Sequence, residues 1–172
     1  MWYRATVQSV TGGQVTVYYV DFGNTSTVAT TGVSAIPPGL VSQIPAQAVQ
    51  CRLAGVSHQG EVGDKFRSIV RDDKFRVRVE RMDGGVCVVQ ASTLPPPGTN
   101  INTELVRMSD NRNMRQGWDK KSSSPNTGVA GDTEELFITW VESSNSFYGQ
   151  LTRLGGQELK EFLVRLSDYC HR

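Results

Sequence analysis

Apolar and polar residues alternate through much of the chain, which is the pattern of β-strands with one buried face. Segments 3–7 and 14–20 alternate on either side of a Thr-Gly-Gly turn, and the second is rich in β-branched and aromatic residues, which predicts a hairpin. A tight turn at 21–24, where Gly23 is free to adopt a positive φ, leads into a third strand at 25–28. Three consecutive antiparallel strands with short turns predict a small bent barrel.

The central part of the chain predicts further strands around one short helix. The run at 48–53 reads as a strand, and apolar residues recur at helical spacing within 65–70. Strict alternation over 74–80, followed by an Asp-Gly-Gly turn and an apolar run at 86–89, predicts a half-exposed hairpin.

The composition changes beyond this hairpin. Pro, Ser, Asn, Gly, Thr and charged residues dominate 94–133, which predicts a disordered linker. Segments 136–141 and 147–151 then flank a polar turn and predict another hairpin. Apolar residues form one stripe along 157–170, which predicts an amphipathic helix that covers another part of the protein. The expected fold is therefore mainly β with minor α.

Charge and hydropathy narrow the classes of partner. The 172 residues carry 18 Lys and Arg against 17 Asp and Glu, a net charge of +1, so the even basic field of a dedicated duplex-DNA or anionic-membrane binder is missing. No apolar run approaches the roughly 20 residues needed to span a bilayer, and the first residues do not resemble a signal sequence. We therefore expect a soluble intracellular protein without a membrane partner.

The cysteines are odd in number and far apart. Cys51, Cys87 and Cys170 include no Cys-x-x-Cys pair, and two of them lie in strand-like runs, so we expect reduced and mostly buried thiols. Cys170 and His171 are adjacent, but one such pair makes a poor zinc site. No metal and no cofactor are expected.

Four short motifs resemble the core signature of an extended Tudor domain, over about residues 2 to 92. They are Trp2-Tyr3-Arg4-Ala5, Val17-Tyr18-Tyr19-Val20-Asp21-Phe22-Gly23-Asn24, Ile36-Pro37 and Pro45-Ala46-Gln47-Ala48. The resemblance implies a Tudor SH3-like bent β-barrel joined to a staphylococcal-nuclease-like (OB-fold) half, with a C-terminal β-hairpin and long helix.

The same resemblance divides the chain. Residues 1–46 correspond to the Tudor barrel core, whose first strand would lie upstream, and 47–93 to the nuclease-like part. Residues 134–172 are similar to the segment that opens an extended Tudor unit, ahead of its Trp-Tyr-Arg-Ala strand. Two alternatives stay open: this segment belongs to the next unit of a tandem protein, or it folds back to complete the present one.

The resemblance also implies a binding site for methylated arginine. Tyr3, Tyr19 and Phe22 match the walls of an aromatic cage, and Asn24 matches the amide that bonds the guanidinium. A dimethylguanidinium keeps its charge but loses donors, so aromatic faces attract it by about 0.5–2 kcal/mol per ring. Tyr19 and Phe22 can line one cage only if the backbone turns between them. Asp21 is expected chiefly to stabilise that turn and, secondarily, to add negative potential near the mouth.

Extended Tudor domains bind symmetric dimethylarginine in the arginine-glycine-rich tails of PIWI-type or Sm-type proteins. By resemblance, we expect a non-enzymatic reader within a multi-Tudor scaffold of the PIWI small-RNA (piRNA) pathway. It would act in the cytoplasm, in perinuclear germ granules, and would join ribonucleoproteins through its partner. The family's cage usually has a further aromatic wall just before the Trp-Tyr-Arg-Ala motif, at which this sequence begins.

Two other functions compete with this reading. A degenerate Tudor adaptor would bind proteins without recognising methylarginine. A nuclease-like or nucleic-acid-binding module is less favoured, because metal-dependent cleavage needs carboxylates and arginines gathered at one site. No catalytic motif matches the residues Arg71, Asp72, Asp73, Arg76 and Arg78. The predicted linker also contains basic residues that are interrupted by Asp110 and Asp119, so we interpret it as a solvated segment. These basic residues are Arg107, Arg112, Arg115, Lys120 and Lys121.

Overall fold

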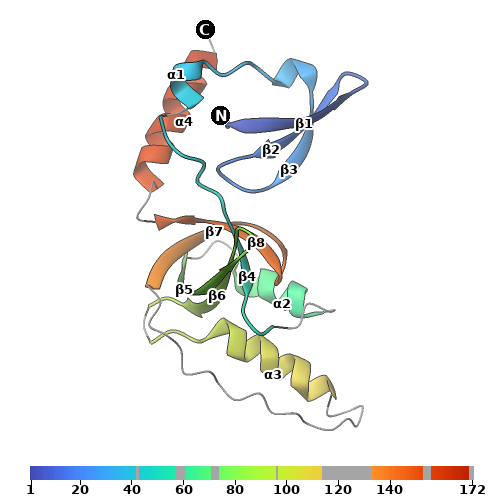
Figure 1. Ribbon diagram of the computed structural model, residues 1–172, viewed down its shortest axis with the longest axis vertical. Coiled ribbons are helices and arrows are strands. Elements are labelled where there is room, and N and C mark those ends of the chain that lie inside the picture. Colours follow the sequence, from blue (N-terminus) through green and yellow to red (C-terminus); the bar gives the residue numbers. More distant parts are fainter. Residues whose placement is uncertain are drawn as a thin grey trace.

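The computed structural model describes residues 1–41, 43–56, 61–70, 74–95, 97–113, 133–152 and 156–170. Its strands form two sheets, a three-stranded sheet and a closed five-stranded barrel. Figure 1 shows the three-stranded sheet beside the last helix at one end of the molecule and the barrel at the other. The fold is mainly β, as the alternating pattern predicts.

The first three predicted strands form an antiparallel sheet in the order β1-β2-β3. They are β1 (Ala5–Thr11), β2 (Gln14–Tyr19) and β3 (Thr25–Ala29). Val15 and Val17 point to the covered face of β2 and are 5% and 3% exposed. A short 3₁₀ turn, η1 (Thr30–Gly32), and one turn of helix, α1 (Pro38–Val41), lead away from this sheet.

The barrel has the strand order β4-β6-β5-β7-β8. Its strands are β4 (Val49–Leu53), β5 (Lys74–Asp83), β6 (Val86–Thr93), β7 (Thr133–Ser143) and β8 (Ser146–Leu151). β4 and β6 are parallel, and the other neighbouring pairs are antiparallel. The helix α2 (Glu61–Ile69) inserts Phe66 into the barrel core, where its ring lies 5.1 Å from that of Phe147.

The C-terminal hairpin lies in the same barrel as β4, β5 and β6. β7 pairs with β5, and β8 pairs with β4. Leu136 and Phe147 are 1% and 0% exposed, because alternate residues of both strands point inward. In the structure, segment 134–172 therefore places its hairpin in the barrel of this chain.

The predicted disordered linker over 94–133 is wrong for its first part. Residues 101–113 form the helix α3 (Ile101–Asn113), which begins after the N-cap Asn100, whose side chain accepts the amide of Thr103 at 2.9 Å. Ile101 and Leu105 are fully buried against the barrel. Ile101 and Leu105 have the i, i+4 spacing of a helix, but the polar composition of the segment as a whole outweighs this signal. Residues 114–132, including Trp118, lie outside the described residues.

The helix α4 (Gly156–Cys170) packs its apolar stripe beside the three-stranded sheet, as the pattern predicts. Leu159, Phe162, Leu163 and Leu166 form a second core with Ile44, against which Trp2, Phe22, Ile36 and Leu40 also pack. The amide of Trp2 donates to Ser167 Oγ at 2.9 Å, so the first residues of the chain are held by α4. Among the described residues, no helix is long and apolar enough to cross a membrane.

Candidate binding site

A hollow of about 340 Å³ opens at the end of β2. It is lined by Tyr3, Tyr19, Phe22, Asn24 and Ser26. The Tyr3 ring stands nearly perpendicular to both other rings, at 80° and 6.1 Å from Tyr19 and at 86° and 5.2 Å from Phe22. The structure therefore brings together the four residues predicted as cage walls and amide, with Ser26 beside them.

A tight turn after β2 makes this arrangement possible. The amides of Phe22 and Gly23 both donate to the Tyr19 carbonyl, at 3.1 and 2.8 Å, and the Tyr19 amide donates to the Asn24 carbonyl at 2.9 Å. The reversal brings Phe22 to the side of the chain that Tyr19 faces, which a straight strand forbids. Gly23 has φ +88°, a conformation that favours glycine.

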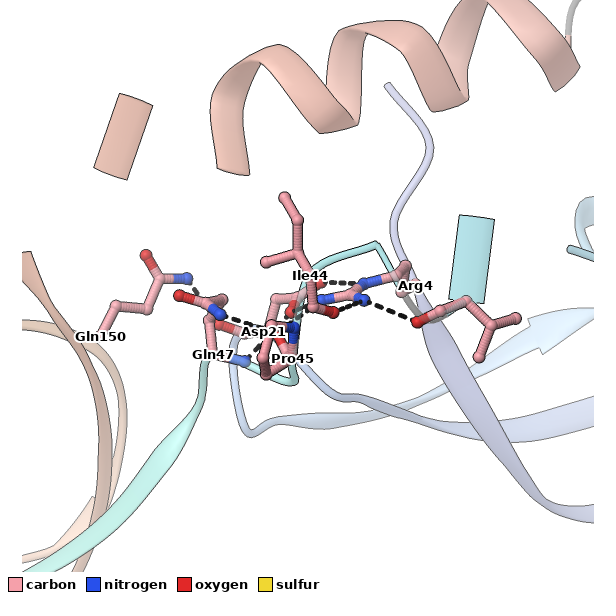
Figure 2. A network of polar contacts seen from close by, with 7 residues as sticks. Arg4, Asp21, Ile44, Pro45, Gln47 and Gln150 are labelled. Carbon is pink, nitrogen blue, oxygen red and sulfur yellow. Dashed lines mark hydrogen bonds and ion pairs between the residues drawn. The ribbon is translucent and has the colours of Figure 1, made fainter. Parts of the chain in front are cut away.

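The turn is fixed from inside by a buried ion pair. Arg4 Nε donates to Asp21 Oδ2 at 2.9 Å and Arg4 Nη2 to Asp21 Oδ1 at 2.6 Å, with the side chains 6% and 0% exposed. Figure 2 shows the guanidinium between Asp21 and the segment before β4, where it also donates to the carbonyls of Val41, Ile44 and Pro45. The Gln47 amide donates to Asp21 Oδ1 at 3.2 Å. Asp21 is therefore a buried turn residue and is not part of the hollow.

The C-terminal hairpin supports the same turn from the barrel side. Thr139 Oγ1 donates to the Phe22 carbonyl at 2.7 Å, and Gln150 Nε2 donates to the Asp21 carbonyl at 2.5 Å. The ring of Tyr148 lies directly against Gly23, since a Cβ added to this glycine would be 2.1 Å from Tyr148 Cγ. The backbone of the turn is thus held by side chains from a hairpin that comes much later in the chain.

Trp2 and Tyr18 do not line the hollow. Trp2 packs against the core beneath α4. The Tyr18 ring lies 6.3 Å from that of Tyr148, on the opposite side of β2 from Tyr19. Burial raises the pKa of Tyr18, with a hydrogen bond to Tyr148 acting in the other direction, and burial also raises the pKa of Tyr148.

Of the residues that support the turn, the sequence motifs indicated Asp21 but not its partners. Arg4 belongs to the Trp-Tyr-Arg-Ala motif, and its charge in an otherwise apolar strand start was the available signal for a buried partner. Thr139, Tyr148 and Gln150 carry no such signal, because their role depends on where the distant hairpin docks.

The residues considered for nuclease chemistry do not form a described site. Arg76 and Arg78 lie on β5 and are half-buried, whereas residues 71–73 lie outside the described residues. Within the described part of the chain, no three His, Cys, Asp or Glu residues are grouped so as to hold a metal ion. The side chain of Cys170, and His171, also lie outside the described residues.

A small sheet packed on a closed barrel, with aromatic rings and an amide gathered at a turn between them, defines a binding module. Residues 1–55 match the Tudor domain family. The solved extended Tudor domain of human TDRD1, in complex with a symmetrically dimethylated peptide, superimposes with a TM-score of 0.56 at 25% identity, covering 62% of this chain and 56% of that one. The third Tudor domain of mouse TDRD1, with a MILI peptide containing dimethylarginine, gives 0.55 at 30% identity, covering 63% and 58%.

Two relatives with similar sequences are named for Tudor or staphylococcal nuclease domains. Tudor domain-containing 6 of Danio rerio is 32% identical over 142 residues, which are 80% of this chain and 6% of the relative. Staphylococcal nuclease domain-containing protein 1 of Drosophila melanogaster is 34% identical over 107 residues, 59% of this chain and 11% of the relative. The chain is an extended Tudor domain protein, and it spans a small fraction of the length of these relatives.

Proposed function

We propose that this module binds methylated arginine and acts by binding, without catalysis. The preferred ligand is symmetric dimethylarginine in an arginine-glycine-rich tail of a PIWI-type or Sm-type protein. The observation that carries the proposal is the set of three rings, in which Tyr3 lies close to both Tyr19 and Phe22, with one amide around the same open hollow.

The geometry suits a methylated cation better than an unmodified one. With ring centroids 5.2 and 6.1 Å from that of Tyr3, a cation in the hollow can lie within the roughly 6 Å over which a ring face attracts it. Methylation removes hydrogen-bond donors and weakens the hydration of the guanidinium. Less hydration free energy is therefore lost when the group leaves water for the hollow. The carbonyl oxygen of the Asn24 side chain can accept one of the remaining N–H donors and fix the direction of the group.

Support also comes from the solved relatives. The human and mouse TDRD1 domains are described in complex with peptides that are symmetrically dimethylated or contain dimethylarginine. Both are at least 25% identical to this chain and share its fold. An exposed cluster of aromatic rings marks a binding site, and rings that stand nearly perpendicular to one another around a hollow suit the capture of a cation.

The test is a titration of fluorescent arginine-glycine peptides, unmethylated and symmetrically dimethylated, into the chain and its variants. We expect micromolar affinity with preference for the methylated peptide. Tyr19→Leu keeps apolar bulk but removes the ring, and should weaken binding of the methylated peptide by about 5- to 30-fold, the loss of one cation–π contact of about 1–2 kcal/mol.

Tyr19→Phe is the matched control, because it keeps the aromatic face and removes only the hydroxyl. It should retain the preference for the methylated peptide. Equal affinity for both peptides in the folded wild-type chain would contradict methylarginine recognition and favour a Tudor adaptor. An asymmetrically dimethylated peptide in the same titration decides which isomer is preferred.

At the level of the whole protein, we propose a scaffold that gathers methylated partners in cytoplasmic, perinuclear germ granules. Several weak modules on one chain raise the effective concentration of a multiply methylated tail and so raise its apparent affinity. Tagged full-length protein should then co-localise with a PIWI-type partner in germ cells, and an inhibitor of arginine methylation should disperse it. Diffuse staining in untreated cells would contradict this proposal.

A further inference from the structure

Three sulfur-bearing side chains lie in one row across neighbouring barrel strands. Cys51 of β4 is the register partner of Cys87 of β6, and Cys87 is in turn the register partner of Met82 of β5. Residues directly opposite each other on adjacent strands point to the same face of a sheet. The topology therefore brings together two thiols that are 36 positions apart in the chain, with a thioether beside them.

The two thiols differ in exposure. Cys51 is 2% exposed, Cys87 is half-buried, and Met82 is 61% exposed beside it. Cys87 Sγ lies 3.3 Å from Met82 Sδ. A cavity of about 290 Å³ is lined by both cysteines, by Glu134 and by six aliphatic side chains: Val49, Val77, Val79, Val89, Leu136 and Leu151. A small oxidant therefore has room to reach the pair.

The pair also has the asymmetry that dithiol chemistry needs. Hydrogen bonding to Cys51 lowers the pKa of Cys87 to about 7, against the opposing effect of burial. The same contact with Cys87, followed by burial, raises the pKa of Cys51. Cys87 is thus the thiolate that can attack an oxidant, and Cys51 is the thiol that remains protonated next to it.

We propose that Cys51 and Cys87 form a reversible disulfide between β4 and β6 when the protein meets a hydroperoxide. The Cys87 thiolate attacks one oxygen of the hydroperoxide and the O–O bond breaks. Cys87 becomes a sulfenic acid, and the departing oxygen takes up a proton and leaves as water from hydrogen peroxide or as an alcohol from an organic hydroperoxide. Cys51 then gives up its proton and its thiolate attacks the sulfenic sulfur; the S–O bond breaks, the proton and the hydroxyl leave as a second water, and the S–S bond forms. Two thiols are oxidised by two electrons in total.

The backbone geometry allows this bond. Adjacent strands are about 4.8 Å apart, within the range of about 4.4–6.8 Å between the Cα atoms of disulfide-bonded residues. Because Cys87 is half-buried and lines the cavity, a reducing thiol can reach the disulfide, so the bond should be reversible. This inference is independent of methylarginine binding, because none of the three residues lines the hollow.

The experiment exposes the folded, reduced chain to a small excess of hydrogen peroxide, blocks free thiols with iodoacetamide and maps the digest by mass spectrometry. We expect a peptide pair linked through Cys51 and Cys87, lighter by two hydrogens and lost on treatment with dithiothreitol. The link should form roughly tenfold more slowly in urea, because the fold supplies the effective concentration of the second thiol.

Variants separate the roles of the sulfur atoms. In Cys51→Ser, Cys87 should accumulate as a sulfenic acid that dimedone captures, whereas in Cys87→Ser, Cys51 should stay reduced. Cys170→Ser is the matched control and should keep the disulfide. Mapping of the wild-type chain decides the proposal even where a variant fails to fold. Oxidation of Met82 with both thiols intact, or a disulfide that forms equally fast in urea, would overturn it.

Discussion

At the residue scale, the Arg4–Asp21 pair couples the binding turn to the start of β1. Both side chains are almost fully buried, and the guanidinium also lies 5.0 Å from the Phe162 ring centroid on α4. Asp21→Asn removes the charge that neutralises Arg4, and breaking a buried pair in this way typically costs about 3–5 kcal/mol. We therefore expect this substitution to lower the free energy of unfolding by that amount, measured by urea denaturation. Asp64→Asn is the control, because it breaks the exposed pair of Asp64 with Arg67 and should lower the free energy of unfolding by no more than about 1 kcal/mol. Equal losses of stability in the two variants would contradict a special role of the buried pair.

At the element scale, the hairpin β7–β8 fixes the turn that carries Phe22. Thr139→Val keeps the side-chain shape but removes the hydroxyl that donates to the Phe22 carbonyl at 2.7 Å, a hydrogen bond worth about 0.5–1.5 kcal/mol. We expect faster hydrogen exchange at the turn amides. We also expect an affinity for the methylated peptide that is about 2- to 10-fold lower. Thr152→Val is the matched control, because its hydroxyl bonds the Glu135 carbonyl away from the hollow. Unchanged exchange at the turn in Thr139→Val would show that the hairpin does not position it.

Some elements of this structure can be predicted from the sequence, and others cannot. The elements with a clear period, such as β5 and α4, follow from local pattern, because burial of one face imposes that pattern. α3 does not follow from local pattern, because its buried apolar residues Ile101 and Leu105 lie among polar neighbours in a segment that reads as a linker. The cluster of Tyr3, Tyr19 and Phe22 could be anticipated from motif resemblance and a turn signal. The contacts of Thr139 and Gln150 could not, because only the docking of distant elements creates them.

At the scale of the whole molecule, the C-terminal hairpin and helix join the two sheets into one structure. The hairpin closes the barrel, α4 packs on the segments that flank the three-stranded sheet, and Tyr148 packs against Gly23 between the sheet and the barrel. Because these elements are consecutive in the chain, we expect a loss of packing in the barrel to destabilise the sheet as well. Phe147→Ala removes a fully buried ring and should cost about 3–5 kcal/mol.

This coupling has a direct readout, because hydrogen exchange reports on each sheet separately. In Phe147→Ala, the slowest amides of β2 and of β5 should lose protection together, and urea should unfold both in one transition. Val164→Ala, on the exposed side of α4, is the control and should leave both within about 0.5 kcal/mol of the wild-type chain. If β2 keeps its protection while β5 loses it, the sheet and the barrel are independent units. The support of the turn by the hairpin would then be a local contact between them, and stabilising the barrel would leave the stability of the sheet unchanged.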